Sequence, residues 1–99
     1  MAKLEGKVAL ITGAAVGLGE GIAEVYAKYG AKLCMVDLSP EVEKTAEKLR
    51  KEYNAEIVTC VANVADPEQM KAAAAKAAEA FGEVNIACCN AGVCLPLKK

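Results

Sequence analysis

The 99-residue sequence predicts an α/β fold in which a doubly wound parallel sheet is covered by helices on both faces. Short apolar segments alternate with longer segments of helical periodicity, in the order βαβαβαβ. The apolar segments are continuous rather than alternating, which is typical of parallel strands buried on both faces. The length allows one domain, and no linker or repeat divides it. We therefore treat residues 1–99 as part of a single domain.

The four predicted strands are short and are bounded by glycine, proline or polar turn residues. They are Lys7–Thr12, Lys32–Asp37, Glu56–Ala62 and Asn85–Cys89. The first predicted helix, Leu18–Tyr29, has apolar residues at helical spacing and is followed by Gly30, a typical residue after a helix C-terminus.

The two later helices carry clear start signals. Ser39 can cap a helix that has Pro40 at its first position and extends to about Lys51. Asp66 starts the last helix in the same way, with Pro67 next and Gln69 as the expected capping-box partner. That helix is rich in alanine to Phe81 and stops at Gly82.

Composition argues against several classes of partner. Twelve basic and 13 acidic residues give a net charge of −1, which provides no long-range attraction for nucleic acid or an anionic membrane. Tryptophan is absent and other aromatic residues are few, so a base-stacking platform is not expected. The first apolar run, Val8–Ile11, is too short for a signal peptide or a membrane span, and we expect a cytoplasmic protein.

The sequence contains five cysteines and no histidine. Their spacing does not match the paired ligands of a zinc site, so no metal site is predicted. Several lie within apolar runs, where a free cysteine behaves as a small hydrophobic residue, and we expect buried thiols. The cysteines are Cys34, Cys60, Cys88, Cys89 and Cys94.

A glycine-rich turn joins the first strand to the first helix, with Gly13, Gly17 and Gly19 after Thr12. In a dinucleotide-binding, or Rossmann, βαβ unit one glycine permits the sharp turn, one lets the backbone approach a pyrophosphate, and one lets the helix pack on the strand. The helix N-terminus then faces the phosphates. A tight turn without a ligand is the alternative, whereas a P-loop is excluded because no Gly-Lys-Ser/Thr follows.

Asp37 ends the second strand, 37 − 19 = 18 positions beyond Gly19. A carboxylate there can accept hydrogen bonds from the adenosine ribose and would repel a 2′-phosphate. Neither Val16 nor Leu38 supplies the basic residue that NADP would require, so NAD is the predicted cofactor. The alternative is that Asp37 only forms a turn or caps a helix near Ser39.

Together these residues resemble the short-chain dehydrogenase/reductase family. The segment Leu4-Glu-Gly-Lys-Val-Ala-Leu-Ile-Thr-Gly13 is similar to the family's entry, the glycines fit its TGxxxGxG turn, and Asn90-Ala91-Gly92 matches the end of its NNAG signature. The resemblance implies a partial Rossmann fold with strand order 3-2-1-4. It also implies cofactor contacts from Gly13, Ala15, Val16, Gly17, Leu18, Gly19, Asp37, Leu38, Asn63, Val64, Asn90, Ala91 and Gly92.

Two positions depart from the family pattern. Asn63-Val64 replaces the usual Asp-Val, so an amide oxygen rather than a carboxylate would meet the adenine amino group. Cys89 replaces the first asparagine of NNAG. The remaining Asn90 can either brace the strand ends or help to line the nicotinamide-side ribose.

The family's catalytic Tyr-x-x-x-Lys pair is missing from this sequence. Its tyrosines, Tyr26, Tyr29 and Tyr53, have glycine, leucine and isoleucine four residues later. The resemblance therefore implies the N-terminal, NAD-binding portion of an enzyme that transfers hydride between NAD(P) and an alcohol or ketone. We assign no catalytic residue and expect no activity from this chain alone. A non-catalytic nucleotide-binding or scaffolding remnant that needs a partner is the alternative.

The last expectation concerns the sheet edge. If no further strand follows Asn85–Cys89, its apolar edge offers unpaired backbone groups to another chain. The sequence therefore predicts self-association through an exposed fourth strand.

Overall fold

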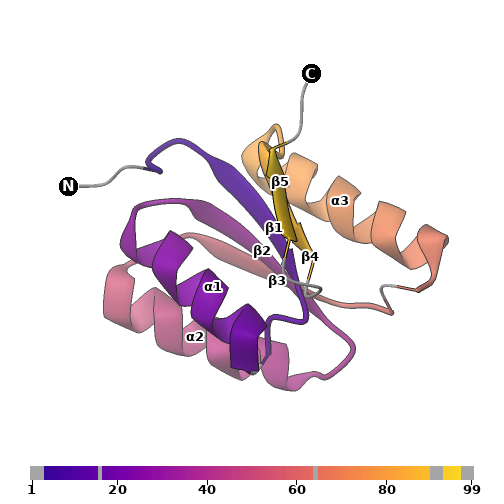
Figure 1. The fold of residues 1–99 in the computed structure, drawn as a ribbon, viewed down its shortest axis with the longest axis horizontal. Coiled ribbons are helices and arrows are strands. Elements are labelled where there is room, and N and C mark those ends of the chain that lie inside the picture. Colours follow the sequence, from indigo (N-terminus) through magenta and orange to yellow (C-terminus); the bar gives the residue numbers. More distant parts are fainter. Residues whose placement is uncertain (1–3, 16, 64, 90–92, 97–99) are drawn as a thin grey trace.

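The computed structural model describes residues 4–15, 17–63, 65–89 and 93–96 (Figure 1). Helices and strands alternate along the chain until two consecutive strands end it. The elements are β1 (Val8–Thr12), α1 (Gly17–Lys28), β2 (Lys32–Asp37), α2 (Glu41–Tyr53), β3 (Ile57–Val61), α3 (Pro67–Phe81), β4 (Ile86–Cys89) and β5 (Val93–Pro96). Each predicted element is present, and its ends differ from the prediction by at most two residues.

The strands form one sheet in the order β3-β2-β1-β4-β5. The first four are parallel, which confirms the doubly wound arrangement and the predicted order 3-2-1-4. Asn85 fastens the start of β4 to β1: its side-chain oxygen accepts the Val8 amide at 2.8 Å, and its own amide donates to the Val8 carbonyl at 2.8 Å. The Asn85 side chain thus adds a hydrogen bond between β1 and β4 at the point where β4 begins.

Helices cover both faces of the sheet, with α1 and α2 on one face and α3 on the other (Figure 1). Ile11 and Met35 point toward α1 and α2, whereas Leu10 and Cys34 pack toward α3. Because neighbouring residues of a strand face opposite sides, both sides must be apolar. This burial explains why the strand sequences are continuously hydrophobic.

The helix ends follow the predicted signals, with two differences. Ser39 Oγ accepts the Glu41 amide at 3.1 Å while Pro40 already has a helical φ of −65°, although the regular helix begins one residue later. Asp66 caps α3 by accepting the amides of Glu68 and Gln69. Gln69, however, does not complete a capping box, because its side-chain oxygen accepts the Asn63 amide at 2.7 Å instead.

The prediction that the fourth strand forms an exposed edge is wrong. β5 pairs with β4 in antiparallel register, from Ile86 opposite Pro96 to Cys89 opposite Val93. Three residues separate the two strands, a length found in β-hairpins, and pairing satisfies the backbone groups that the edge would otherwise leave open. β4 is therefore not the edge of the sheet, and self-association of the chain stays a prediction.

The cysteines only partly follow the prediction. Cys34 is a buried free thiol, and burial raises its pKa to about 11, while Cys60 is a half-buried free thiol. Cys88 is not a free thiol as expected, because it is disulfide-bonded. Among the described residues, no group of three or more His, Cys, Asp or Glu is arranged to bind a metal.

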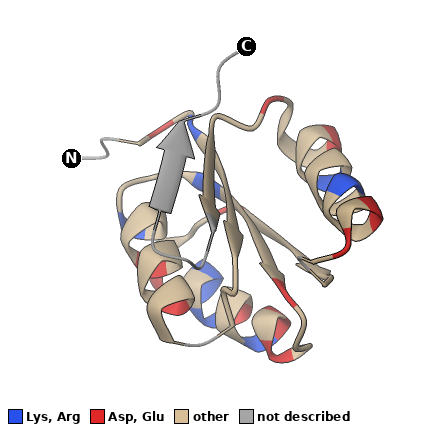
Figure 2. Ribbon diagram, turned by 45° about the vertical axis from the view of Figure 1, so that its right-hand side comes forward, with Lys and Arg blue, Asp and Glu red and all other residues tan. Residues whose placement is uncertain are grey.

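Charged residues of both signs are interspersed along the helices (Figure 2). On the α2 surface, Arg50 bonds to Glu43 at 2.7 Å and to Glu47 at 3.0 Å. Within the described ranges, no helix is both long enough and apolar enough to cross a membrane.

Candidate functional site

The predicted site residues gather where β1, β2 and β3 end. Gly13 follows β1, Asp37 ends β2, and Asn63 lies two residues beyond β3. Since these strands are parallel neighbours, the three residues share the carboxyl edge of the sheet. Ligands of open α/β sheets bind at this edge.

The glycines of the turn have the conformations that their predicted roles require. Gly13 and Gly17 have φ values of +62° and +64°, a region that L side chains rarely adopt. A Cβ atom on Gly19 would lie 1.9 Å from the Gly13 carbonyl oxygen, so only glycine allows α1 to approach the turn this closely. A Cβ on Gly17 would meet no atom within 4 Å, which leaves open space beside the helix N-terminus. Open space beside a helix N-terminus is where a phosphate group can bind, because the first backbone N–H groups of a helix have no partner within the helix.

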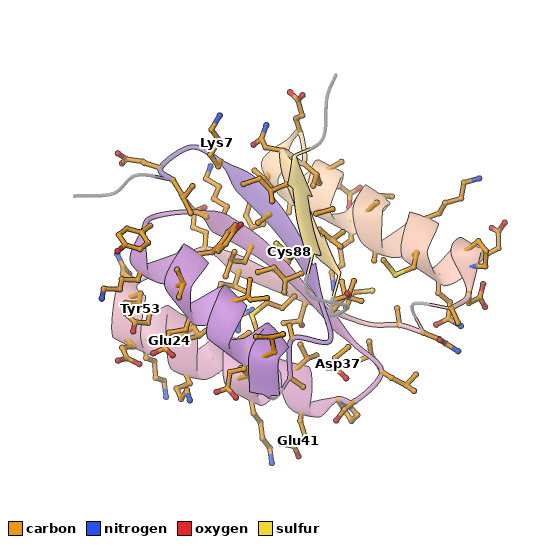
Figure 3. The ribbon with its side chains drawn as sticks, viewed as in Figure 1. Lys7, Glu24, Asp37, Glu41, Tyr53 and Cys88 are labelled. Atoms are coloured by element: carbon orange, nitrogen blue, oxygen red, sulfur yellow. The ribbon has the colours of Figure 1, made fainter. Side chains whose placement is uncertain are left out.

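Asp37 links this turn to the next βα connection. One carboxylate oxygen accepts the Ala15 amide at 2.9 Å, and the other accepts the Ser39 amide at 2.9 Å. Figure 3 shows Asp37 where β2 ends, next to the loop from β1 into α1. The contact with Ser39 is the turn-forming role considered as an alternative for Asp37. Each carboxylate oxygen still has a free lone pair, so this role does not exclude a ligand hydroxyl.

Thr45 is a further contact to the turn that sequence reasoning missed. Its hydroxyl, on the first half of α2, donates to the Ala15 carbonyl at 2.7 Å. The only sequence signal is an uncharged hydroxyl in a helix dominated by charged residues, which does not identify a partner 30 positions earlier.

Asn63 is exposed, and its side chain is already engaged. Its amide oxygen accepts the Ala65 amide at 2.9 Å, an Asx-turn contact. One lone pair of that oxygen stays available for a donor such as an adenine amino group.

Exposed apolar side chains lie at the same edge. Leu18 is 61% exposed at the start of α1, and Leu38 is 68% exposed directly after Asp37. Val61, opposite Asp37 in the β2–β3 register, is 56% exposed and was not predicted as a site residue. The sequence did not indicate this exposure, because Val61 belongs to an apolar strand whose residues were expected to be buried. Val61 is the last residue of β3, at the edge of the sheet where the strands end.

Five predicted site residues lie outside the described residues. They are Val16, Val64, Asn90, Ala91 and Gly92.

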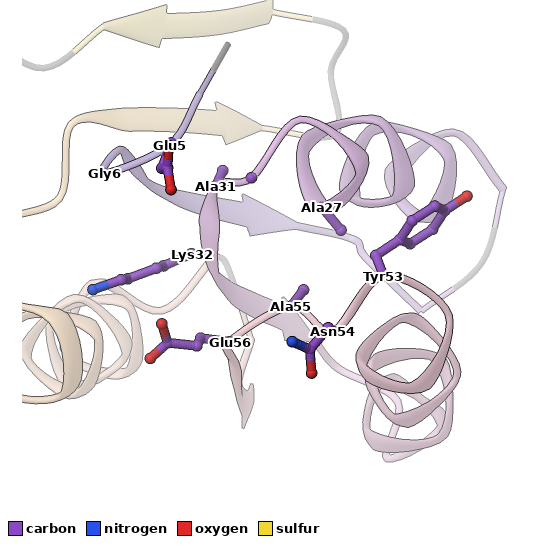
Figure 4. Close-up of a pocket in the computed structure, with 10 residues that line it drawn as sticks. Glu5, Gly6, Ala27, Ala31, Lys32, Tyr53, Asn54, Ala55 and Glu56 are labelled. Carbon is purple, nitrogen blue, oxygen red and sulfur yellow. The ribbon is translucent and has the colours of Figure 1, made fainter. Parts of the chain in front are cut away.

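A cavity of about 340 Å³ lies at the opposite, amino edge of the sheet (Figure 4). Its lining includes Gly6 before β1, Lys32 at the start of β2, and Glu56 before β3. Among the described residues, none of those predicted to contact a cofactor lines this cavity. The two edges of the sheet are therefore separate candidates, and the glycine turn belongs to the carboxyl edge.

Comparison with known proteins assigns the family. Residues 7–99 match the short chain dehydrogenase family. The chain belongs to this family. Oxidoreductase UcpA of Escherichia coli (strain K12) is 48% identical over 94 residues, a stretch that covers 95% of this chain and 35% of that protein. The chain thus spans about a third of the length of the curated relatives it matches.

Solved structures of short-chain dehydrogenases share the fold. L-sorbose reductase from Gluconobacter frateurii, complexed with NADPH and L-sorbose, superposes with a TM-score of 0.83 at 31% identity, covering 87% of this chain and 33% of that one. A family member from Burkholderia phymatum in complex with NAD gives 0.82 at 38% identity, covering 88% and 31%. The match over most of this chain confirms that it has the N-terminal architecture of the family.

Proposed function

We propose that this chain binds the adenosine and pyrophosphate portion of NAD at the carboxyl edge of its sheet. The glycine turn supplies backbone donors and open space beside Gly17 for the pyrophosphate. Asp37 supplies acceptors for the ribose, and Leu18 and Leu38 supply exposed apolar surface at the same edge. The family neighbours that were solved with NAD or NADPH support a nicotinamide dinucleotide as the ligand class.

The observation that carries the preference for NAD is the position of Asp37. Its carboxylate is held in place by two backbone amides, so it cannot easily turn away from a ligand. A 2′-phosphate brought against this carboxylate would bring two negative groups together, whereas a ribose hydroxyl would donate to it. Leu38, the next residue, offers no positive charge to compensate.

Calorimetric titration of the 99-residue chain with NAD and with NADP tests this proposal. A hydrogen bond to a charged group contributes about 1.5–3 kcal/mol, so NAD should bind at least about tenfold more tightly than NADP. ADP-ribose should bind about as tightly as NAD, because the proposed contacts all lie in the part of the molecule that the two share. Tighter binding of NADP, or no binding of either dinucleotide, would contradict the proposal.

In a longer protein, this portion would serve an oxidoreductase that transfers hydride between the nicotinamide cofactor and an alcohol or ketone. The chain itself carries no Tyr-x-x-x-Lys pair for proton transfer. The alternative, a nucleotide-binding or scaffolding remnant, uses the same site without catalysis. A Tyr-x-x-x-Lys pair in the sequence that follows Lys99 would favour the enzyme. The cytoplasmic location stays a prediction.

A further inference from the structure

We propose that Thr45 is a positioning residue that holds the glycine turn in the shape used for dinucleotide binding. This inference rests on the proposed function, because it concerns the same site. Thr45 is on α2, so it belongs neither to the glycine motif nor to β2, which carries Asp37.

The contact itself is specific. Thr45 Oγ1 lies 2.7 Å from the Ala15 carbonyl oxygen and 3.4 Å from the Glu41 carbonyl oxygen. A hydroxyl has one hydrogen to donate, and the shorter distance assigns it to Ala15. The bond to Ala15 therefore replaces the contact with the preceding turn of its own helix that a threonine in a helix often makes.

Ala15 is the point where the turn is fixed from both sides. Its amide donates to Asp37 at 2.9 Å and its carbonyl accepts from Thr45 at 2.7 Å, so both of its backbone polar groups bond to side chains. The residue is only 2% exposed. Without the Thr45 hydroxyl, the nearly buried Ala15 carbonyl would lose this hydrogen-bond partner. The loss costs free energy, and the turn would have to move for the carbonyl to find another donor.

The helix that carries Thr45 is itself anchored to α1. Further along α2, Lys48 bonds to Glu20 at 2.9 Å and the Tyr53 hydroxyl donates to Glu24 at 2.8 Å. Figure 3 shows Tyr53 and Glu24 together, where α2 lies alongside α1. α2 thus makes three polar side-chain contacts with the segment that contains the turn and α1. The contact of Thr45 is the first along α2, and it reaches the turn, whereas the other two reach α1.

A turn held in this way needs no ordering when a ligand arrives. Preorganisation increases affinity because the binding site does not lose conformational freedom on association. Loss of the Thr45 hydroxyl should therefore loosen the turn in the free protein and weaken dinucleotide binding.

The test compares Thr45→Val, which keeps the shape but removes the donor, with Thr45→Ser, which keeps the donor. Thr59→Val is the matched control, because the Thr59 hydroxyl bonds to the exposed Glu43 carboxylate at 2.6 Å, away from the turn. The first readout is amide hydrogen exchange at Ala14 and Ala15 in the ligand-free 99-residue chain. The second is calorimetric titration with NAD.

We expect Thr45→Val to speed exchange of the Ala15 amide and to weaken NAD binding, each by about fivefold, the effect of losing one neutral hydrogen bond. Thr45→Ser and Thr59→Val should match the unsubstituted chain in both readouts. If Thr45→Val does not fold, Thr45→Ala replaces it, since alanine places no methyl group against the Ala15 carbonyl.

Unchanged exchange at Ala15 in the variants without a hydroxyl would overturn the inference, even if NAD binds. So would a Thr45→Ser chain that behaves like Thr45→Val, because the methyl group rather than the hydroxyl would then matter. Failure of the unsubstituted chain to bind NAD would contradict the proposed function, while the exchange data would still decide whether Thr45 positions the turn.

Discussion

The Asp37 carboxylate accepts the backbone amide of Ala15 at 2.9 Å, across 22 positions of the sequence. The carboxylate proposed to bind the ribose is therefore also part of the frame that holds the glycine turn. The two roles are compatible, because a carboxylate offers about four lone pairs and only two are used by backbone amides. Substitutions of Asp37 must accordingly be interpreted for both stability and ligand binding.

Asp37→Ala should weaken NAD binding about tenfold or more and should also lower the melting temperature. The first effect follows from the lost charged acceptor, and the second follows because the Ala15 and Ser39 amides both lose their partner. Calorimetric titration and thermal unfolding of the same samples measure the two effects.

Asp37→Asn separates charge from hydrogen bonding. It keeps one acceptor oxygen but removes the negative charge, so it should narrow the difference in affinity between NAD and NADP. An unchanged ratio of the two dissociation constants would mean that the Asp37 charge does not select the cofactor.

Gly19→Ala should lower the free energy of unfolding by about 1–3 kcal/mol, because the new Cβ would lie 1.9 Å from the Gly13 carbonyl oxygen. Gly21→Ala, two residues later in α1, is the matched control. A Cβ there meets no atom within 4 Å, and the exchange should stabilise the helix by about 0.5–1 kcal/mol. Urea unfolding of both variants measures this contrast. Equal stabilities would show that α1 does not pack on the turn this closely.

The contact between Tyr53 and Glu24 predicts a loss of stability in alkaline solution. The hydrogen bond to the Glu24 carboxylate raises the pKa of Tyr53 to about 12 from an ordinary value of about 10. Because the folded protein binds this proton more tightly than the unfolded chain, the contribution is complete below pH 10 and is lost as the pH rises through 12. Phenolate absorbance should show Tyr53 titrating at a higher pH than an ordinary tyrosine.

Glu24→Gln is the control for this titration. Removing the charge should lower the Tyr53 pKa toward 10 and reduce its contribution to the alkaline decline in stability. A late-titrating tyrosine that persists in Glu24→Gln would contradict the assignment to this pair.

The 99-residue chain should not oxidise secondary alcohols with NAD. It has no tyrosine followed by lysine at the fourth position, so no tyrosine–lysine proton donor is present. Absorbance of NADH over a panel of alcohols is the measurement, with a sample of Asp37→Ala prepared in parallel to reveal contaminating enzymes. Sustained turnover in the unsubstituted sample alone would disprove this prediction.

Local patterns in the sequence predicted most of the fold. The continuous apolar runs and the caps at Ser39 and Asp66 depend on neighbouring residues, so they could be recognised without coordinates. The antiparallel β5 could not, because Val93–Pro96 is too short to distinguish a strand from a tail, and only its pairing with β4 defines it. The side-chain partner of Gln69 was also missed, because the Asp66 amide donates to the Asn63 carbonyl at 3.0 Å, a contact within the loop that the capping-box pattern does not reveal.

The site also contains residues that local sequence patterns identify and one residue that they do not. Gly13, Gly17, Gly19 and Asp37 were recognisable because their spacing follows from a single βαβ unit. Thr45 was not, because its bond to Ala15 depends on how α2 packs beside α1. Contacts between separate elements leave no periodic signal in the sequence.

The proposed dinucleotide site lies at the carboxyl edge of the sheet and uses the glycine turn and Asp37. Backbone amide NMR shifts of the 99-residue chain, followed during titration with ADP-ribose, test it most directly. We expect saturable shifts at Gly13, Ala15 and Asp37, with Gly6 and Glu56 at the opposite cavity unaffected. Shifts confined to the cavity residues, or no shifts at saturating ligand, would contradict it.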